Sequence, residues 1–274
     1  MKNTLLLLIS AITFQLSAQV IPAMNDKYPT GTYKREQRVI SKFRCPTAPI
    51  KDLQANMRTV GKAYVRYNPT YQNTTAEFTY TEISGIRRED GKVFDMGNPI
   101  EDKTEYAYKV VYNNEGRAEM VQGRDIYMNA VMNDNIHDLT EGGFFTYFLH
   151  NDKARNIGDT WVDSIFSLPL TEHIPMTYTF SKVEKTKKGR TAARIDITGD
   201  LEYNNHFGMI LKNTYEMNLK GKVSGYMWVD MKTNRIYRIR ALIELEGMVN
   251  VDGKDQPYNM EVKLHEWEMD PVGL

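Results

Sequence analysis

Residues 191–203 read TAARIDITGDLEY, and this stretch decides the fold class. Its odd positions hold apolar or small side chains, and most of its even positions hold charged or polar ones. Successive side chains of a β-strand point to opposite faces of a sheet, so this two-residue rhythm predicts a strand with one dry face and one wet face. The rhythm returns in four further stretches, which are residues 209–219, 223–229, 237–251 and 258–264.

These alternating runs are longer than most strands. A strand usually has roughly three to ten residues, so runs of about 12 to 20 residues need strong twist, coiling or bulges to stay in one sheet. Gly199, Gly225 and Gly247 each lie inside a run, where the missing β-carbon permits such bending. The sequence therefore predicts a mainly β protein, built on a large curved antiparallel sheet, or half-barrel, with a single apolar face.

Turn signals separate the predicted strands. Asp252-Gly253 and residues 230–234 punctuate the C-terminal runs, and Glu89-Asp90-Gly91 follows a shorter alternating run at residues 76–81. A second short run, residues 106–112, predicts one more strand. Strands joined by such short turns are expected to pair as antiparallel neighbours.

Two segments have the three- and four-residue spacing of amphipathic helices. The first is residues 49–66, where Pro49 suits the first helical turn, and the second is an insert at about residues 124–151. An uncovered apolar patch as large as the predicted face would aggregate, so the sheet needs a cover. We therefore expect one to three helices against the concave apolar face.

The first residues have the pattern of an export signal. Lys2 is followed by an apolar run and then by Ala18, which predicts cleavage that removes residues 1–18 as a signal peptide. The apolar run is shorter than the about 20 residues that a transmembrane helix needs. Residues 19–48 contain several prolines and little periodicity, so we expect an extended N-terminal arm before a single β-rich domain at residues 49–274.

Charge and cysteine content narrow the classes of partner. The chain has 35 Lys and Arg residues against 35 Asp and Glu residues. A nucleic-acid partner is recruited by an excess of basic residues, so none is expected here. Cys45 is the one cysteine, so an internal disulfide cannot hold the fold.

Catalytic and metal-binding motifs are not apparent in the sequence. The five histidines do not have the three- or four-residue spacing of metal ligands on one helical face. Residues 133–138 are rich in oxygen ligands but lack the glycine and the distal glutamate of the common calcium loop. We expect no cofactor, no metal and no enzymatic activity, although two carboxylates distant in sequence could still meet in space.

Methionines recur on the predicted dry faces and on the predicted helical insert. Methionine is flexible and polarizable, and it lines apolar surfaces that adapt to variable contents. One interpretation is an ordinary core with methionine as filler, and the other is an apolar cavity that the sheet and helices leave open. The residues predicted to bind an apolar ligand are Met128, Met132, Phe144, Phe148, Tyr215, Met217 and Met227.

Two short strings carry a resemblance. The chain resembles uncharacterised exported β-rich proteins of Gram-negative bacteria, which have a Gly-Asp-Thr-Trp string before a C-terminal sheet and an aspartate in the turn after a Trp-containing strand. Here these are residues 158–161 and 228–234. The expected architecture is also similar to that of Lol-type periplasmic lipoprotein carriers, in which a curved sheet holds acyl chains beneath helices. The resemblance implies no catalytic residues.

The leading hypothesis is a non-enzymatic protein of the periplasm or cell surface of a Gram-negative bacterium that binds an apolar ligand or a lipidated partner. It is not expected to be an integral membrane protein. The first alternative is a structural or assembly module that binds another envelope protein through an edge strand or the N-terminal arm. The second alternative is a hydrolase whose site is assembled from residues distant in sequence.

Overall fold

The computed structural model describes residues 20–21, 30–44, 52–95, 107–112, 118–122, 149, 152–167, 172–186, 189–210 and 213–271. All regular structure in these ranges is β-strand, and they contain no helix. The prediction of a mainly β protein is therefore confirmed. The strands are β1 (Val20–Ile21), β2 (Gly31–Arg44), β3 (Asp52–Asn68), β4 (Asn73–Glu89), β5 (Lys92–Asp95), β6 (Ala107–Tyr112), β7 (Ala118–Gln122), β8 (Arg155–Asn156), β9 (Thr160–Ser167), β10 (Glu172–Lys185), β11 (Thr191–Ile210), β12 (Asn213–Asp230), β13 (Ile236–Val251) and β14 (Lys254–Pro271).

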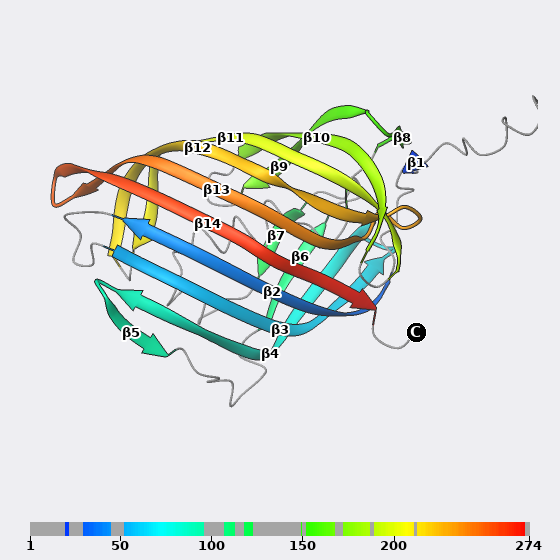
Figure 1. The fold of residues 1–274 in the computed structure, drawn as a ribbon, viewed down its shortest axis with the longest axis horizontal. Helices are drawn as coiled ribbons and strands as arrows, with labels where there is room; N and C mark the ends of the chain where they lie inside the picture. The colour runs from blue at the N-terminus through cyan, green and yellow to red at the C-terminus, as the bar shows by residue number, and fades with distance from the viewer. Residues whose placement is uncertain are drawn as a thin grey trace, which may run out of the picture.

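One 12-stranded sheet contains nearly all of these strands (Figure 1). Its order is β7-β6-β4-β3-β2-β14-β13-β12-β11-β10-β9, with β5 paired to β4 beside this path. Every pairing along the path is antiparallel, and most neighbours are consecutive in sequence. The exceptions are β4 with β6, between which β5 lies in sequence, and β2 with β14, which joins the N-terminal and C-terminal strands into one sheet.

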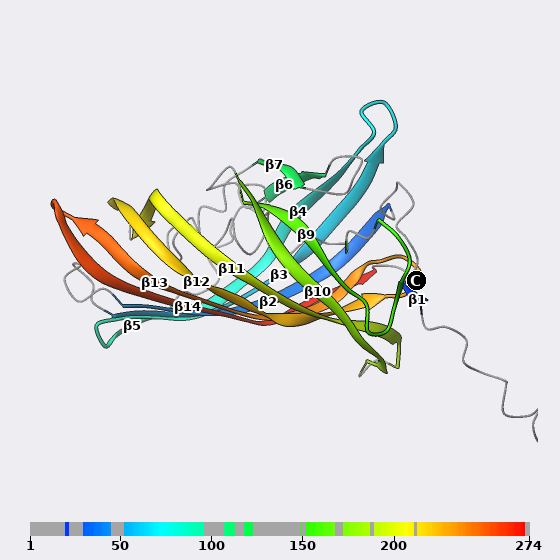
Figure 2. The same cartoon turned by 90° about the horizontal axis from the view of Figure 1, so that it is seen from above.

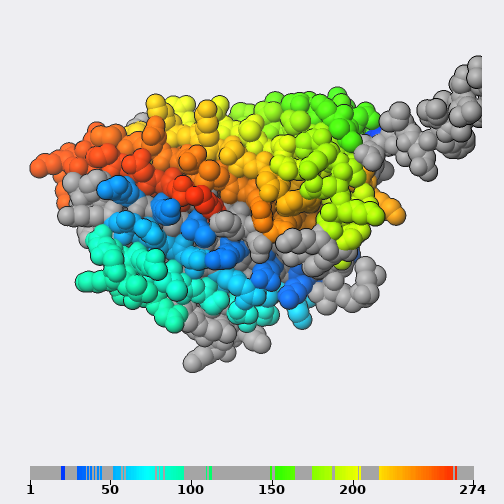
Figure 3. Space-filling view, in the orientation of Figure 1, coloured from blue at the N-terminus to red at the C-terminus, as the bar shows by residue number. Residues whose placement is uncertain are grey.

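The sheet is strongly curved (Figure 2). Strands β2, β3, β13 and β14 form the floor of a trough, and β6, β7 and β9 lie on its concave side. The two ends of the path, β7 and β9, contact each other. Figure 3 shows the opposite, convex side in space-filling form, where β2 lies beside β14. The predicted large curved antiparallel sheet is thus present.

Buried side chains lie on one face of the sheet, which we call the apolar face. Inward rows run from strand to strand because paired residues share a face. Ile195, Met227 and Ile239 form one such row across β11, β12 and β13, and all three are buried. On the opposite face, which we call the polar face, charged residues such as Lys220 and Glu246 are exposed. This is the one-sided distribution that the two-residue rhythm predicts.

Glycines permit close approach of β12 and β13. A β-carbon on Gly221 would lie 1.8 Å from the Glu244 carbonyl oxygen, and one on Gly225 would lie 2.2 Å from that of Arg240. At Gly199 the space is taken by a side chain instead, because the Met176 sulfur would lie 2.3 Å from an added β-carbon. Glycine inside these long strands is therefore required by packing, as well as suited to bending.

The helix predicted at residues 49–66 is wrong, because this segment forms most of β3. Both faces of β3 carry apolar side chains: Leu53 is on the apolar face, whereas Val60 pairs with Glu36 of β2 on the polar face. Together with Tyr64, these residues imitate helical spacing. Small buried residues such as Ala55 and Ala63 keep the two-residue rhythm of a strand.

Two other predictions differ from the structure, and two lie outside the described residues. Residues 31–44, expected within an extended arm, form β2 in the middle of the sheet; Pro29 and Pro46 flank this strand without interrupting it. The predicted run at residues 209–219 spans a hairpin, since β11 ends at Ile210 and β12 begins at Asn213. The helical insert at 124–151 lies outside the described residues except for Leu149, and the signal peptide lies wholly outside them.

Candidate functional site

The apolar face is the first candidate site. Four methionines that the sequence places on the dry face are buried there, namely Met176, Met217, Met227 and Met260. Met217 is 1% exposed and Met227 is 3% exposed. Both belong to β12, which lies near the middle of the C-terminal half of the sheet. These side chains form part of the buried apolar face.

The structure does not bring the predicted ligand-binding residues together. Met217 and Met227 are ten residues apart in one strand, which corresponds to about 30 Å along β12. Tyr215 is also in β12, but its side chain lies outside the description. The remaining predicted residues, Met128, Met132, Phe144 and Phe148, lie outside the described residues. A ligand touching both methionines would have to extend along most of the trough.

A second group of residues lies where β12 turns into β13. We call Tyr33, Arg190, Asp230, Arg235 and Tyr237 the Arg235 cluster. The guanidinium carbon of Arg235 is 4.8 Å from the centre of the Tyr237 ring and 5.3 Å from that of Tyr33. The guanidinium carbon of Arg190 is 5.4 Å from the Tyr237 ring centre. Two arginines thus contact one buried tyrosine, within the range of cation–π attraction.

Asp230 anchors the turn between these strands. Its Oδ1 accepts hydrogen bonds from the backbone N–H of Lys232 and of Thr233, both at 2.8 Å, and from the Thr233 hydroxyl at 3.0 Å. Its Oδ2 accepts a hydrogen bond from the Tyr237 hydroxyl. Asn234 completes the turn with a φ of 54°, a conformation that asparagine tolerates. The carboxylate is therefore committed to holding the turn.

Protonation in this cluster follows from burial and hydrogen bonding. Burial favours the neutral form of Asp230, but the hydrogen bonds from Tyr237, Lys232 and Thr233 outweigh it and lower the pKa of the carboxyl. Burial, together with the bond to Asp230, raises the pKa of Tyr237 to about 12. Burial also raises the pKa of Tyr33, and the charge of Arg235 opposes this rise. At neutral pH the cluster thus holds neutral Tyr33 and Tyr237 beside a charged Asp230.

Arg235 differs from the other buried arginine of the described residues. Arg155 is 7% exposed, lies 4.8 Å from the Trp161 ring centre and forms an ion pair with Asp152. Arg235 is 8% exposed, and none of the ion pairs within the described ranges includes it. Its Nε has no hydrogen-bond partner there either, but the Arg235 side chain is hydrogen-bonded to the side chains of Tyr33 and Tyr237. Tyrosine hydroxyls and rings thus take the place that a carboxylate has beside Arg155.

The Gly-Asp-Thr-Trp string has a structural role. Gly158 adopts a φ of 92° in the turn that leads into β9, and the Asp159 carboxylate accepts a 2.7 Å hydrogen bond from the Asn156 backbone N–H. The backbone of Asp159 and Gly158 also bonds to Phe180 of β10. Trp161 then stacks on Tyr178 at 5.6 Å between ring centres. The string thus forms the turn and first residues of the β9–β10 hairpin.

The polar face carries a groove of about 1050 Å³ that crosses the strands. Charged side chains line it in two rows. In one row Lys222 lies between Asp200 and Glu244, and in the other Lys220 lies between Glu202 and Glu246. Opposite charges on neighbouring strands favour this register of the sheet. The alternating charges along the groove are therefore explained in part by strand pairing alone.

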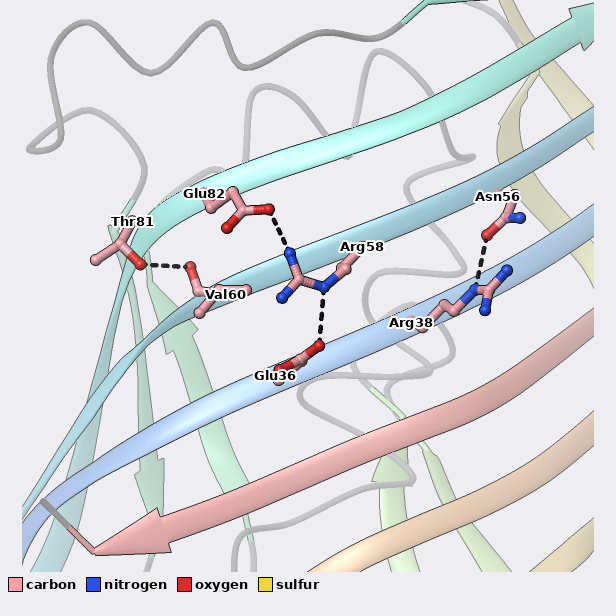
Figure 4. Close-up of polar contacts among 7 residues, drawn as sticks. All are labelled: Glu36, Arg38, Asn56, Arg58, Val60, Thr81 and Glu82. Atoms are coloured by element: carbon pink, nitrogen blue, oxygen red, sulfur yellow. Dashed lines mark hydrogen bonds and ion pairs between the residues drawn. The ribbon is translucent and has the colours of Figure 1, made fainter.

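Polar contacts also link β2, β3 and β4 on this face (Figure 4). Arg58 of β3 donates through Nε to Glu36 of β2 at 2.8 Å and through another nitrogen to Glu82 of β4. Thr81, the extra residue where the β3–β4 register shifts, donates its hydroxyl to the Val60 carbonyl at 3.1 Å. These contacts stabilise the pairing of three strands and assemble no catalytic group.

The described residues contain neither a metal-binding cluster nor a membrane-spanning helix. No group of three or more His, Cys, Asp or Glu side chains in the described ranges could hold a metal ion. Helices long and apolar enough to cross a membrane are likewise absent from those ranges. The carboxylates Glu244 and Glu246 lie on the polar face opposite lysines, as strand alternation predicts.

Comparisons with known proteins show little. No known protein family matches the sequence, and no curated protein matches it. One similar solved structure concerns lipid–protein interactions in lipovitellin, with a sequence identity of 10% and a TM-score of 0.44. The match covers 90% of this chain and 26% of the lipovitellin chain. The chain thus spans about a quarter of the lipovitellin chain. A second is DynF from the dynemicin biosynthesis pathway of Micromonospora chersina, with 7% identity, a TM-score of 0.22, and 91% and 86% of the two chains covered. Similarities this weak carry no argument about function.

Proposed function

We propose that this protein binds an apolar ligand, or the lipid part of a lipidated partner, against the apolar face of its curved sheet. The observation that carries the proposal is the one-sided sheet: buried apolar residues from β3 and β10 to β13 line one concave face. Apart from the two-residue strands β1 and β8, the described residues supply no second sheet or helix to pack against it. A concave apolar surface is the usual form of a site for small apolar molecules.

Methionine supports the same function. Met176 of β10 and Met217 and Met227 of β12 lie at three places on the apolar face, and a thioether side chain adjusts to contents of different shape. Small inward residues, such as Gly225 and its cross-strand partner Ala241, lie between larger ones. A ligand lying on the floor would find the least side-chain bulk at these two positions.

Filling the floor tests the proposal. Ala241→Phe adds bulk on the apolar face, whereas Leu242→Phe adds an aromatic ring on the polar face of the same strand. We expect delipidated wild-type protein and L242F to bind a fluorescent apolar probe, displaceable by oleic acid, and A241F to bind it at least tenfold more weakly. Urea unfolding of each variant separates loss of the site from loss of the fold.

The milder Met227→Leu keeps the volume of the side chain but removes its flexibility. We expect it to fold normally and to bind a narrower range of chain lengths than the wild type. Equal binding of the probe by wild type, A241F and L242F, with all three folded, would contradict the proposed site.

We further propose that the protein acts after export, in the periplasm or at the cell surface. The signal-like residues 1–18 and the resemblance to exported proteins support this location. Fractionation of the native host, with N-terminal sequencing of the mature chain, tests it. A chain that retains residues 1–18 and stays in the cytoplasm would contradict it.

The polar-face groove supports a second candidate function, docking of another envelope protein. Its two rows of alternating charge offer complementary contacts to a partner with charges of both signs. Replacing Lys220 and Lys222 by Glu would then abolish a stoichiometric complex recovered from the host envelope without changing probe binding. Recovery of the same complex with the doubly substituted protein would exclude the groove as the docking surface.

A further inference from the structure

The charges of the polar-face groove are arranged in stripes, with one sign to a strand. Three neighbouring strands each contribute two exposed charges, which are Asp200 and Glu202 of β11, Lys220 and Lys222 of β12, and Glu244 and Glu246 of β13. The members of each pair are two residues apart in their strand, so they lie on the same face of the sheet. The groove therefore presents an acidic, a basic and an acidic stripe side by side.

The stripes continue onto the next three strands, β14, β2 and β3 (Figure 1). Glu261 of β14 pairs with Glu244 on one side and with Lys42 of β2 on the other. Arg44 follows Lys42 two residues later, and it pairs with Asp52 of β3. The second groove position on β14 and on β3 holds a neutral amide side chain, namely Asn259 and Gln54. From β11 to β3 the order of sign is thus acidic, basic, acidic, acidic, basic, acidic.

Strand pairing accounts for only part of this order. Opposite charges on neighbouring strands stabilise a sheet, which explains why Lys222 lies between Asp200 and Glu244. Pairing does not require the second row to repeat the signs of the first, because a row with every sign reversed would pair equally well. Glu244 and Glu261 lie directly opposite each other, which disfavours pairing. The repeated sign along each strand therefore points to a partner outside the sheet.

We propose that the polar-face groove binds an α-helix of a partner protein, which lies across the strands and carries the complementary order of charge. This inference rests on the second candidate function, docking of another envelope protein, and names the element that docks. Neighbouring strands are about 4.8 Å apart. Side chains on one face of a helix follow one another at axial steps of about 4.5 to 6 Å, whereas those on one face of an extended strand are about 6.7 Å apart. A helix therefore offers about one side chain to each stripe.

The paired charges suit single side chains of such a helix. A lysine or arginine over β13 meets two carboxylates, Glu244 and Glu246, and a carboxylate over β12 meets the two ammonium groups of Lys220 and Lys222. A helix about 10 Å wide covers both rows of the groove. The six stripes span about 24 Å, which is the length of about 16 helical residues.

A second copy of this chain does not complement the groove. The order of sign is the same whether it is read from β11 or from β3, so two grooves stacked with their stripes aligned would oppose like charges. Like charges across an interface suppress association. The groove thus selects a partner whose order of charge is the reverse of its own.

Two fluorescein-labelled, alanine-based helical peptides of identical composition test the proposal. At successive steps of three or four residues, the first carries Lys-Glu-Lys-Lys-Glu-Lys and the second carries Glu-Lys-Lys-Lys-Lys-Glu. Fluorescence anisotropy with the full-length protein gives the affinity for each, and circular dichroism verifies that both are helical. We expect the wild type to bind the first peptide tenfold or more tightly than the second. This preference should shrink in about 1 M salt, which screens exposed charges.

An exchange of charge tests the register of the helix. Lys220→Glu combined with Lys222→Glu makes the β12 stripe acidic, so this variant should prefer a third peptide, Lys-Lys-Lys-Lys-Glu-Lys, over the first by tenfold or more. Lys34→Glu combined with Lys62→Glu is the matched control, because it makes the same change of charge on the polar face outside the groove. The control should keep the order of preference of the wild type. If urea unfolding shows that the groove variant does not fold, the first two peptides decide the question with the wild type.

The outcomes separate the helix from the docking function. Equal affinity of the wild type for the first two peptides, or binding of neither, overturns the proposed helix. A preference for the third peptide that the control shares also overturns it, because net charge alone would then explain the binding. A wild-type dimer that K220E/K222E dissociates would assign the groove to a second copy and overturn it as well. If the host complex is nevertheless lost with K220E/K222E, docking at the groove stands and only the helix is excluded.

Discussion

Asp230 and Tyr237 show how single residues hold the hairpin at the β12–β13 end of the trough. The carboxylate accepts four hydrogen bonds, one of them from a tyrosine hydroxyl that is itself buried. A hydrogen bond to a charged group contributes more to stability than a neutral one. The turn is therefore fixed by charge-assisted hydrogen bonds as much as by the apolar contacts of the adjoining strands.

Asp230→Asn tests the role of this charge. The amide keeps an acceptor for the backbone donors but loses the charge and the second acceptor for Tyr237, so we expect the free energy of unfolding at pH 7 to fall by about 1 to 2 kcal/mol. The folded-state pKa of Asp230 is lowered, so its contribution is complete above the unfolded pKa of about 4 and is lost as the pH falls through the folded pKa.

Urea unfolding between pH 7 and pH 3 measures this dependence. The difference between the wild type and D230N should shrink below about pH 4. Asp252→Asn, at an exposed position of the β13–β14 turn, provides the control and should cost little at any pH. A pH-independent difference for D230N would show that the charge is not what stabilises the turn.

Gly221 is a second position where one residue decides the local geometry. Its added β-carbon would meet the Glu244 carbonyl at 1.8 Å, so the neighbouring backbone would have to move. We expect Gly221→Ala to lower the free energy of unfolding by about 1 to 3 kcal/mol, the usual cost of overpacking. Ser224→Ala, at an exposed position of the same strand, is the matched control. Similar stability of the two variants in urea would contradict the close approach of β12 and β13.

Among the elements, β3 and β11 mark the limits of prediction from sequence. β11 is predictable because its apolar residues, such as Ile195 and Ile197, occupy only one face. β3 cannot be predicted in this way, because Val60 and Tyr64 lie on its polar face and add helix-like spacings to the pattern of apolar residues. The Arg235 cluster is beyond the reach of local pattern, since Tyr33 and Arg235 meet only through the pairing of β2 with β14.

Arg58 links β2, β3 and β4, and its contribution should be modest. The Arg58, Glu36 and Glu82 side chains are about two-fifths exposed, and exposed ion pairs are worth roughly 0.2 to 1 kcal/mol. We expect Arg58→Gln to lower the free energy of unfolding by less than about 1 kcal/mol. This loss should become smaller in about 1 M salt, which strongly screens exposed charges. Arg66→Gln, at an exposed position of β3, is the control. A salt-independent loss would indicate that packing over Val60, and not charge, is what Arg58 supplies.

At the scale of the whole molecule, one curved sheet separates two surfaces of opposite character. The concave face carries the buried apolar residues, and the polar face carries the charged groove. The pairing of β2 with β14 makes each of these two faces continuous between the N-terminal and C-terminal strands. An apolar ligand suits the first surface, and a protein partner suits the second.

The central claim is that the apolar face holds an apolar ligand. Native mass spectrometry of the mature protein, purified without detergent from its own host, tests it most directly. We predict a mass in excess of the polypeptide that organic solvent removes and that fragments as an acyl-chain compound. A spectrum of the bare polypeptide, from folded protein that also fails to take up oleic acid, would contradict the claim.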